Sequence, residues 1–301
     1  MSNLLSISDI GDDVLEILDL AKKFKNGKIQ GKPLEDKSLA MIFQKSSTRT
    51  RVSFDIGMYQ LGGHSLFLSQ ADLQMGRGEP IADTAKVLSR YVDGIMIRAV
   101  SHNDVENLAK EAKVPVISGL TNIEHPCQAL ADMQTIEEYF NGFKNRKLCF
   151  AGDGNNVCNS LLLISAYLGM DMSVACPKGY EPDSEIINKA IEISKKTDCE
   201  ISISSDIEIA AKDADVIYTD VWVSMGDEEH QEKRRNDLLK YQVNDKFMKL
   251  VKEDAIFMHC LPAIRGEEVT NEVIDGPQSV IFDQAENRLH AQKAVLYYFL
   301  K

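Results

Sequence analysis

Short runs of apolar residues alternate along the whole chain with longer segments in which apolar residues recur every three or four positions. The short runs predict buried strands, and the longer segments predict helices that pack on a sheet. We expect strands at residues 39–43, 66–68, 94–97, 114–118, 147–151, 172–176, 200–204, 215–219, 255–258 and 279–282. We expect helices at residues 11–26, 52–61, from about 80, 103–112, up to about 140, 156–168, 184–196, 231–251 and 285–300. This alternation predicts an α/β protein built from two doubly wound parallel sheets.

The length of 301 residues also favours two domains, because single cores rarely grow this large. The pattern breaks at Asn141-Gly142-Phe143-Lys144-Asn145, near the expected boundary. We therefore expect a first domain at residues 1–135 and a second at residues 136–284. The C-terminal helix, residues 285–301, is expected to pack back on the first domain.

Composition and charge narrow the choice of partner and compartment. The formal net charge of −12 argues against nucleic acid, and an anionic substrate would need a local basic pocket. No apolar run approaches the roughly 20 residues of a membrane span, and the first residues lack a secretory pattern. The six cysteines, at positions 127, 149, 158, 176, 199 and 260, show neither zinc-site spacing nor a disulfide framework. We expect a reduced, cytoplasmic protein.

Residues 45–53, Lys-Ser-Ser-Thr-Arg-Thr-Arg-Val-Ser, lie where a predicted strand turns into a helix. Val52, Ile56 and Tyr59 share one face of that helix. Arginine in a first helical turn opposes the helix dipole, and a bound anion would remove the conflict. A solvated basic turn with Ser47 or Thr48 as an ordinary N-cap explains the segment equally well.

Polar residues also follow other predicted strands. They are Arg98, His125, the segment 152–156, Asp220 and His259-Cys260. Ligands of open α/β sheets bind beyond the carboxyl ends of the strands. These positions together therefore predict a ligand-binding site. Taken singly, Arg98 fits a surface arginine, His125 a turn histidine and Cys260 a small buried residue.

The segment Gly152-Asp153-Gly154-Asn155-Asn156-Val157 follows a strand and opens a helix. It has only the first two glycines of the dinucleotide fingerprint, and the next strand ends without an acidic residue. Nicotinamide binding is therefore the weaker interpretation. The Asn155-Asn156 pair would instead bind a carboxylate or cap the helix.

Three segments resemble the signatures of the carbamoyltransferase family. They are Ser47-Thr48-Arg49-Thr50-Arg51, His125-Pro126-Cys127-Gln128 and His259-Cys260-Leu261-Pro262. Cys127, the third segment and Asp220-Val-Trp-Val-Ser224-Met225-Gly226 are similar to the ornithine branch, whereas putrescine-specific relatives are expected to lack the Ser-Met-Gly triplet. The matches run in the family's order from about residue 45 to about residue 290.

The resemblance implies two Rossmann-like domains with the active site in the cleft between them. It implies transfer of a carbamoyl group from carbamoyl phosphate to the side-chain amine of L-ornithine, giving L-citrulline and phosphate in arginine metabolism, in the biosynthetic direction. It implies no metal and no organic cofactor, and a homotrimer or a multiple of trimers. Charge and composition, as above, indicate no nucleic acid and no membrane partner.

Residue roles are carried over from the resemblance by position. The implied catalytic residues are Arg98, His125, Asp220 and Cys260. The implied carbamoyl phosphate ligands are Ser47, Thr48, Arg49, Thr50, Gln74, Arg98, His125, Gln128, Cys260, Leu261 and Arg288, with Gln74 acting in a neighbouring subunit's site. The implied ornithine ligands are Asn156, Asp220, Ser224 and Met225. Arg51 lies two positions from Arg49 on a helix, so it cannot face the same ligand and is expected to be structural.

Two other classes of function remain as alternatives at this point. A nicotinamide oxidoreductase would use Gly152–Gly154, and a catalytically silent phosphate-binding subunit would keep only part of the site. Within the transferases, aspartate and putrescine are alternative acceptors.

Overall fold

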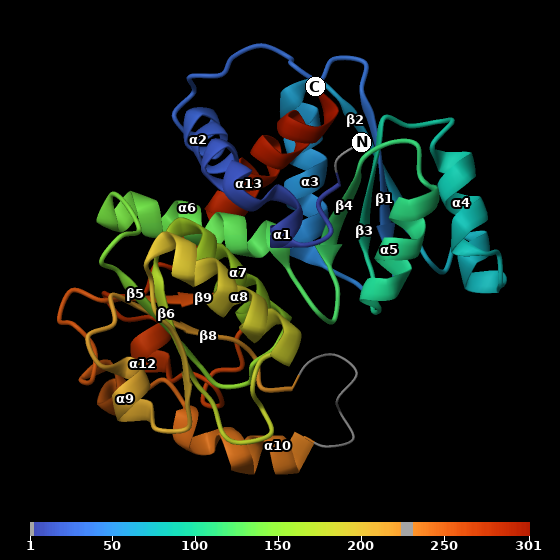
Figure 1. Ribbon diagram of the computed structural model, residues 1–301. Coiled ribbons are helices and arrows are strands. Elements are labelled where there is room, and N and C mark those ends of the chain that lie inside the picture. Colours follow the sequence, from blue (N-terminus) through green and yellow to red (C-terminus); the bar gives the residue numbers. More distant parts are fainter. Residues whose placement is uncertain (1–2, 224–230) are drawn as a thin grey trace. The chain divides into compact units, whose positions relative to one another are not determined.

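The computed structural model describes residues 3–223 and 231–301. Its contacts divide the chain into two compact units, residues 1–134 with 286–301 (unit 1) and residues 135–285 (unit 2). Each unit is a parallel sheet with flanking helices, which confirms the predicted α/β architecture (Figure 1).

Unit 1 contains a four-stranded sheet in the order β2-β1-β3-β4. Its strands are β1 (Ser38–Phe43), β2 (His64–Ser69), β3 (Gly94–Arg98) and β4 (Val116–Leu120). Its helical segments are α1 (Ile7–Ile10), η1 (Gly11–Asp13), α2 (Val14–Lys25), α3 (Thr48–Leu61), η2 (Gln74–Arg77), α4 (Ile81–Leu88), α5 (His102–Glu111) and parts of α6 (Pro126–Phe140) and α13 (Ile281–Leu300). In Figure 1, α4 and α5 cover one face of the sheet and α3 and α13 the other.

The C-terminal helix α13 is tied to the other helices of unit 1 by polar contacts. Lys25 Nζ donates to Asn287 Oδ1 at 2.8 Å, and Lys293 Nζ donates to Gln60 Oε1 at 3.0 Å. These contacts anchor α13 on both sides of Arg288.

Unit 2 contains a five-stranded sheet in the order β7-β6-β5-β8-β9. Its strands are β5 (Lys147–Ala151), β6 (Asp171–Ala175), β7 (Ile201–Ser204), β8 (Val216–Thr219) and β9 (Ile256–His259). Its helical segments, besides those shared with unit 1, are α7 (Asn156–Leu168), α8 (Ser184–Thr197), α9 (Ile207–Ala211), α10 (Gln231–Leu238), η4 (Leu239–Tyr241), α11 (Asp245–Met248) and α12 (Asn271–Ile274). Buried residues of α9, α11 and α12 form one apolar cluster with the sheet.

Two predicted elements are wrong. The strand expected at 279–282 is a single bridge between Ser279 and Phe257, and α13 already begins at Ile281. The helix expected at 231–251 breaks into α10, η4 and α11, because Val243 bridges Val269 and Asn244 caps a new helix. Both errors come from contacts with residues distant in the sequence, which hydrophobic periodicity does not register.

Helix α3 exposes the apolar face that its sequence pattern displays. Val52, Ile56 and Tyr59 are 52%, 40% and 77% exposed, whereas Phe54 and Met58 are buried. The adjacent strand β2 lies at the sheet edge and exposes further apolar side chains. A face of this kind is typical of a surface that contacts another protein.

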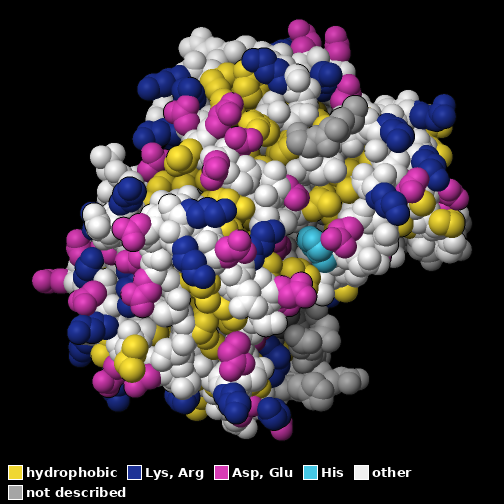
Figure 2. Space-filling model, viewed as in Figure 1, with side chains coloured by type: hydrophobic (Ala, Val, Ile, Leu, Met, Phe, Trp, Pro, Cys, Tyr) yellow, Lys and Arg dark blue, Asp and Glu magenta, His cyan; other side chains and the backbone are white. Residues whose placement is uncertain are grey.

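Figure 2 shows acidic and basic side chains mixed over the visible face of the molecule. An anion would therefore have to be bound by local groups rather than by a general basic surface. Among the described residues, no helix combines the length and the apolar character needed to cross a membrane.

Candidate active site

In unit 1, strand register brings the end of β3 beside the end of β1. Phe43 pairs with Arg98, and the Gln44 N–H donates to the Arg98 carbonyl at 2.9 Å. Arg98 is buried, so a guanidinium lies at the carboxyl edge of the sheet next to the 44–47 turn. This is the edge at which parallel sheets bind their ligands.

Ser47 is the N-cap of α3, as the simpler sequence interpretation allowed. Its backbone is extended, and its Oγ accepts a hydrogen bond from the Thr50 N–H at 3.3 Å. The first turn contains Arg49 and no acidic residue, so no side chain of that turn offsets the positive end of the helix dipole. The remaining N–H groups and the hydroxyls suit an anion.

Arg288 of α13 joins this turn to α6. Its Nη1 donates to Gln128 Oε1 at 2.5 Å, and its Nη2 donates to Thr50 Oγ1 at 3.2 Å. Gln128 in turn donates from Nε2 to Asp132 Oδ1 at 2.8 Å. Thr50, Gln128 and Arg288 are all buried, so the structure brings together three predicted site residues from three helices.

His125 lies immediately before α6 and is buried. Burial, followed by the charges of Arg288, Arg98 and Arg49, holds the pKa of His125 well below its ordinary 6.5. The imidazole is therefore neutral near pH 7, where it can donate one hydrogen bond to a substrate oxygen without adding charge. Three arginines and a neutral histidine form an environment suited to a dianion.

Two further residues of this region stand apart from the cluster. Arg51 places its guanidinium carbon 3.7 Å from the centre of the Phe67 ring, a cation–π contact that accounts for it structurally. Gln74 is exposed at the start of η2. Among residues 3–223 and 231–301, no hydrogen bond or ion pair joins Gln74 to the other site residues.

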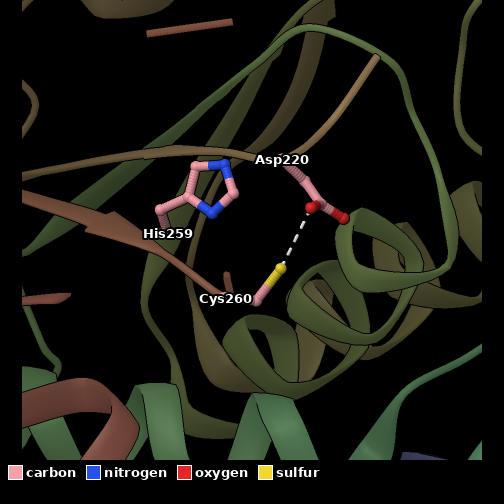
Figure 3. Close-up of side chains that lie close together, drawn as sticks. All are labelled: Asp220, His259 and Cys260. Carbon is pink, nitrogen blue, oxygen red and sulfur yellow. Dashed lines mark hydrogen bonds between the residues drawn. The ribbon is translucent and has the colours of Figure 1, made fainter. Parts of the chain in front are cut away.

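In unit 2, register brings together the ends of three strands. Ala151 of β5 pairs with Thr219 of β8, and Thr219 pairs with His259 of β9. The residues that follow, among them Asp220 and Cys260, therefore lie side by side at the carboxyl edge. Figure 3 shows the Asp220 carboxylate facing the Cys260 thiol.

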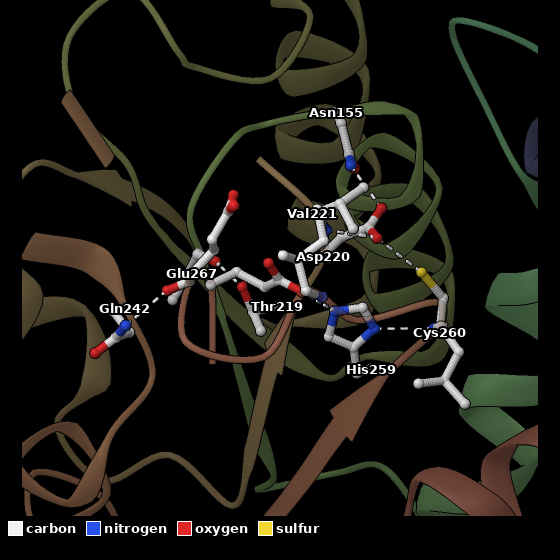
Figure 4. A network of polar contacts seen from close by, with 12 residues as sticks. Asn155, Thr219, Asp220, Val221, Gln242, His259, Cys260 and Glu267 are labelled. Atoms are coloured by element: carbon white, nitrogen blue, oxygen red, sulfur yellow. Dashed lines mark hydrogen bonds and ion pairs between the residues drawn. The ribbon is translucent and has the colours of Figure 1, made fainter. Parts of the chain in front are cut away.

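Asp220 is held by three donors. Cys260 Sγ donates to Oδ1 at 3.0 Å, the Val221 N–H donates to Oδ1 at 2.8 Å, and Asn155 Nδ2 donates to Oδ2 at 2.7 Å (Figure 4). Asp220 is 8% exposed, and the fixed orientation of its carboxylate suits recognition of an ammonium group.

Asn155 does two things at once, and sequence reasoning identified only one. Its Oδ1 accepts from the N–H groups of Val157 and Cys158, so it is the N-cap of α7. Its amide nitrogen orients Asp220. Asn156, the predicted ornithine ligand, is the first residue of α7. The predicted ligands Ser224 and Met225 lie outside the described residues.

The two glycines of the 152–156 turn have a structural explanation. Gly152 has a φ of +124°, and a Cβ there would lie 3.3 Å from Trp222 Nε1. At Gly154 a Cβ would lie 2.3 Å from the backbone nitrogen of Pro182, and the Gly154 N–H donates to the Tyr180 carbonyl at 2.8 Å. The chain at 180–182 thus occupies the space beside the turn, so the glycines do not require a dinucleotide.

Arg234 of α10 also anchors this turn and was missed by sequence reasoning. It forms an ion pair with Asp153 and donates from Nε to the Trp222 carbonyl at 2.8 Å. Its guanidinium also lies 5.1 Å from the centre of the Tyr180 ring. In the sequence, the one hint of this ion pair is the acidic Asp153 between two glycines.

The segment after β9 is anchored by a buried histidine. His259 Nδ1 accepts from the Leu261 N–H at 2.9 Å, and His259 Nε2 contacts Glu268 Oε1 at 3.1 Å. Asp220, His259 and Cys260 offer polar atoms within 4.8 Å of one another. Because both ring nitrogens are engaged within the chain, the histidine has no lone pair left for a metal ion. The cluster is better suited to holding a polar substrate.

Two family models match most of the chain. The carbamoyl-P binding domain of aspartate/ornithine carbamoyltransferase matches residues 2–138, and the Asp/Orn binding domain of the same family matches residues 144–299.

Individual relatives agree with these matches along their full length. An ornithine carbamoyltransferase of Methanobrevibacter smithii is 69% identical over 100% of both chains. One of Methanothermobacter thermautotrophicus is 62% identical over 100% of this chain and 99% of the relative. The solved structure of the Pyrococcus furiosus ornithine carbamoyltransferase has a TM-score of 0.96 and 54% identity, and the match covers 99% of this chain and 96% of that chain. The chain therefore belongs to the aspartate/ornithine carbamoyltransferase family.

Proposed function

We propose that this protein transfers the carbamoyl group of carbamoyl phosphate to the side-chain amine of L-ornithine, giving L-citrulline and phosphate. The observation that carries the proposal is the buried set formed by Arg98, His125, Gln128 and Arg288. Arg98, His125 and Gln128 lie in the part of the chain that matches a carbamoyl-P binding domain, and Arg288 donates to Gln128 from the C-terminal helix. Similarity to full-length relatives named ornithine carbamoyltransferase supports the acceptor.

Carbamoyl phosphate carries about two negative charges near neutral pH, as a phosphate monoester does. We propose that Ser47, Thr48, Arg49 and Thr50 bind its phosphate at the start of α3, where donors are plentiful. Arg288 would complete the phosphate contacts from the opposite helix, using the planar fork that already contacts Thr50 and Gln128.

The acceptor site is proposed in unit 2. The Asp220 carboxylate suits the α-ammonium of ornithine, and Asn156 at the start of α7 suits its α-carboxylate. An aspartate acceptor would bring a second carboxylate toward Asp220, and putrescine would leave Asn156 without its carboxylate. The charge of the site therefore favours ornithine. We propose that Ser224 and Met225 contribute to the same ligand and that Leu261 lines the reacting centre with Cys260.

The proposed reaction begins with the neutral amine of ornithine. Alkyl ammonium groups titrate near ~10.4, so the amine must lose a proton before its lone pair attacks the carbamoyl carbon. A new C–N bond forms, and the carbonyl becomes a tetrahedral oxyanion that Thr50, Arg98 and His125 stabilise by hydrogen bonds. The C–O bond to phosphate then breaks, phosphate leaves with the electron pair, and it takes up the proton that the attacking nitrogen gives up. We propose that Cys260, beside Asp220, helps to orient the attacking amine.

The direct test supplies carbamoyl phosphate with ornithine, aspartate or putrescine in separate reactions. We expect carbamoylated product only with ornithine, released together with an equal amount of phosphate. Preferential product from aspartate or putrescine would overturn the acceptor, and no product from any amine would overturn the transferase assignment.

We also propose a homotrimer in which Gln74 serves the site of a neighbouring copy. The apolar face of α3, formed by Val52, Ile56 and Tyr59, supports a contact between copies. The exposed position of Gln74 supports a role outside its own chain. Light scattering after size exclusion measures the assembly directly.

A mixing experiment tests the shared site. Refolding inactive Arg98→Ala chains with Gln74→Ala chains should restore part of the activity, because some sites would then combine intact residues from both chains. If the mixed assembly is no more active than its components, Gln74 acts within its own chain or not at all.

A further inference from the structure

A buried carboxylate lies behind the segment that carries Cys260. Glu268 and His259 are both inaccessible to solvent, and Glu268 Oε1 lies 3.1 Å from His259 Nε2. The same oxygen accepts the Ile264 N–H at 2.6 Å. Glu268 lies outside all of the sequence motifs.

The hydrogen-bond pattern determines the tautomer of His259. The Leu261 N–H can only donate, so Nδ1 of the ring must be the acceptor at 2.9 Å. In a neutral ring the proton then resides on Nε2, where it donates to Glu268 Oε1. The carboxylate thereby stabilises the same neutral tautomer that the Leu261 amide requires.

The backbone at Leu261 affects the position of the neighbouring Cys260 thiol. Leu261 has a φ of +58°, a left-handed backbone conformation that residues other than glycine adopt infrequently. It directly follows Cys260, whose thiol contacts Asp220 at 3.0 Å. A change at Leu261 therefore displaces the thiol relative to the carboxylate proposed to bind ornithine.

We propose that Glu268 is a positioning residue, which fixes the Nε2–H tautomer of His259 and through it the placement of Cys260 and Leu261. A carboxylate is an unfavourable choice for a purely structural role in this place. Its Oε2 is buried and has no hydrogen-bond partner among residues 3–223 and 231–301, which costs folding free energy. The carboxylate offers in return an acceptor that cannot donate, so the opposite tautomer is disfavoured.

The tautomer can be read without any assay of activity. Nitrogen-15 spectra of histidine-labelled protein distinguish a protonated Nε2 from a protonated Nδ1, and the signal is assigned by its loss in His259→Asn. We expect His259 in the wild-type protein to be the neutral Nε2–H form. A predominant Nδ1–H form would overturn the proposal.

A kinetic test of Glu268 depends on the proposed transfer of the carbamoyl group to ornithine. Glu268→Ala should raise KM for ornithine by about tenfold to a hundredfold, while the affinity for carbamoyl phosphate changes less than about threefold. Glu268→Gln keeps a carbonyl oxygen for His259 and Ile264, so it should restore most of the loss. Glu267→Ala is the matched control, because the neighbouring glutamate pairs with Arg235 at 2.8 Å instead.

A thiol-reactivity measurement reports on placement directly. Four cysteines are buried, and only Cys199 and Cys260 are partly accessible, so alkylation in a Cys199→Ser background isolates Cys260. We expect Glu268→Ala to change the alkylation rate by about tenfold and Glu268→Gln to leave it near the background value.

The outcomes separate the two proposals. If the wild-type protein makes no citrulline, the proposed function fails while the tautomer and alkylation results still decide the role of Glu268. If citrulline is made but folded Glu268→Ala keeps the wild-type KM and alkylation rate, Glu268 is not a positioning residue. Should Glu268→Ala fail to fold, the spectra of the wild-type and Glu268→Gln proteins remain decisive.

Discussion

Arg288 on α13 donates to Gln128 on α6 at 2.5 Å although 160 positions separate them in the sequence. The same guanidinium reaches Thr50 at 3.2 Å. One side chain thus links the last helix to the two segments expected to bind carbamoyl phosphate.

Replacing Arg288 should therefore weaken carbamoyl phosphate binding. We expect Arg288→Ala to lower the affinity about a hundredfold, because a buried charged partner is lost. Arg288→Lys should recover only part, since an ammonium cannot contact Thr50 and Gln128 with one planar fork. Titration calorimetry measures both. Arg265→Lys, at an exposed arginine paired with Asp275, is the control. An unchanged affinity in Arg288→Ala would contradict the role.

Arg98 should matter most for turnover. It lies buried at the end of β3, and we expect Arg98→Ala to lower kcat by about 10² to 10³, the usual effect of removing an oxyanion donor. Arg90→Ala, at an exposed arginine that precedes the same strand, should leave kcat unchanged. Retention of most activity by Arg98→Ala would remove Arg98 from the oxyanion role.

Cys260 should affect ornithine more than carbamoyl phosphate. Cys260→Ser replaces a thiol that contacts Asp220 at 3.0 Å, so the carboxylate and the acceptor amine are repositioned. We expect a rise in KM for ornithine of about tenfold, with carbamoyl phosphate affinity nearly intact. Steady-state kinetics with each substrate varied in turn makes the comparison, and Cys199→Ser is the control. Equal losses for both substrates would refute this division.

Asn155 allows capping and substrate positioning to be separated. Asn155→Ser keeps an N-cap oxygen for the Val157 N–H but loses the donor to Asp220. We expect near wild-type stability with weaker ornithine binding. Asn155→Ala should also lower the free energy of unfolding by about 1 kcal/mol through loss of the cap. Thermal unfolding and ornithine kinetics are measured on both variants. If both bind ornithine normally, the contact with Asp220 is dispensable.

Stability should depend on pH through Asp215. Burial raises the pKa of Asp215, but hydrogen bonds from Arg146, Lys252 and the Lys147 N–H outweigh it and hold the pKa below the ordinary 3.8. A carboxylate with a depressed pKa stabilises the fold fully above its unfolded value, and the stabilisation is lost as pH falls through the folded value. The contribution should thus be constant near neutral pH and disappear below about pH 4.

Asp215→Asn tests this dependence. We expect the variant to be about 3 kcal/mol less stable near pH 7, because two cations lose a buried partner. The difference from the wild-type protein should shrink as the pH falls below about 4. Urea unfolding at a series of pH values measures it. A difference that is constant down to about pH 3 would show that Asp215 is not the titrating group.

Local sequence patterns determined most of the fold because strand and helix periods are set by local side-chain direction. The apolar run before residue 45 is β1, the Asn-rich turn after residue 151 opens α7, and Ser47 caps α3. The family motifs likewise pointed to both polar clusters, because their residues are contiguous or stand at strand ends.

Tertiary packing decided what those patterns left open. The apolar stripe of Val52, Ile56 and Tyr59 is exposed rather than buried, because Phe54 and Met58 occupy the inner face. Residues 281–282 belong to α13 rather than to a strand, because only Ser279 bridges β9. A single sequence records which residues are apolar but not which neighbours cover them.

The sequence by itself determined the alternation of strands and helices, the acidic composition and the segments that carry the family's chemistry. Only the tertiary structure decided how single side chains are used. Arg288 joins Thr50 to Gln128, Asn155 divides its amide between a helix cap and Asp220, and Glu268 sets the tautomer of a buried histidine. These contacts connect residues far apart in the chain, and their energies depend on burial and on directed hydrogen bonds. Neither quantity exists until the chain is folded.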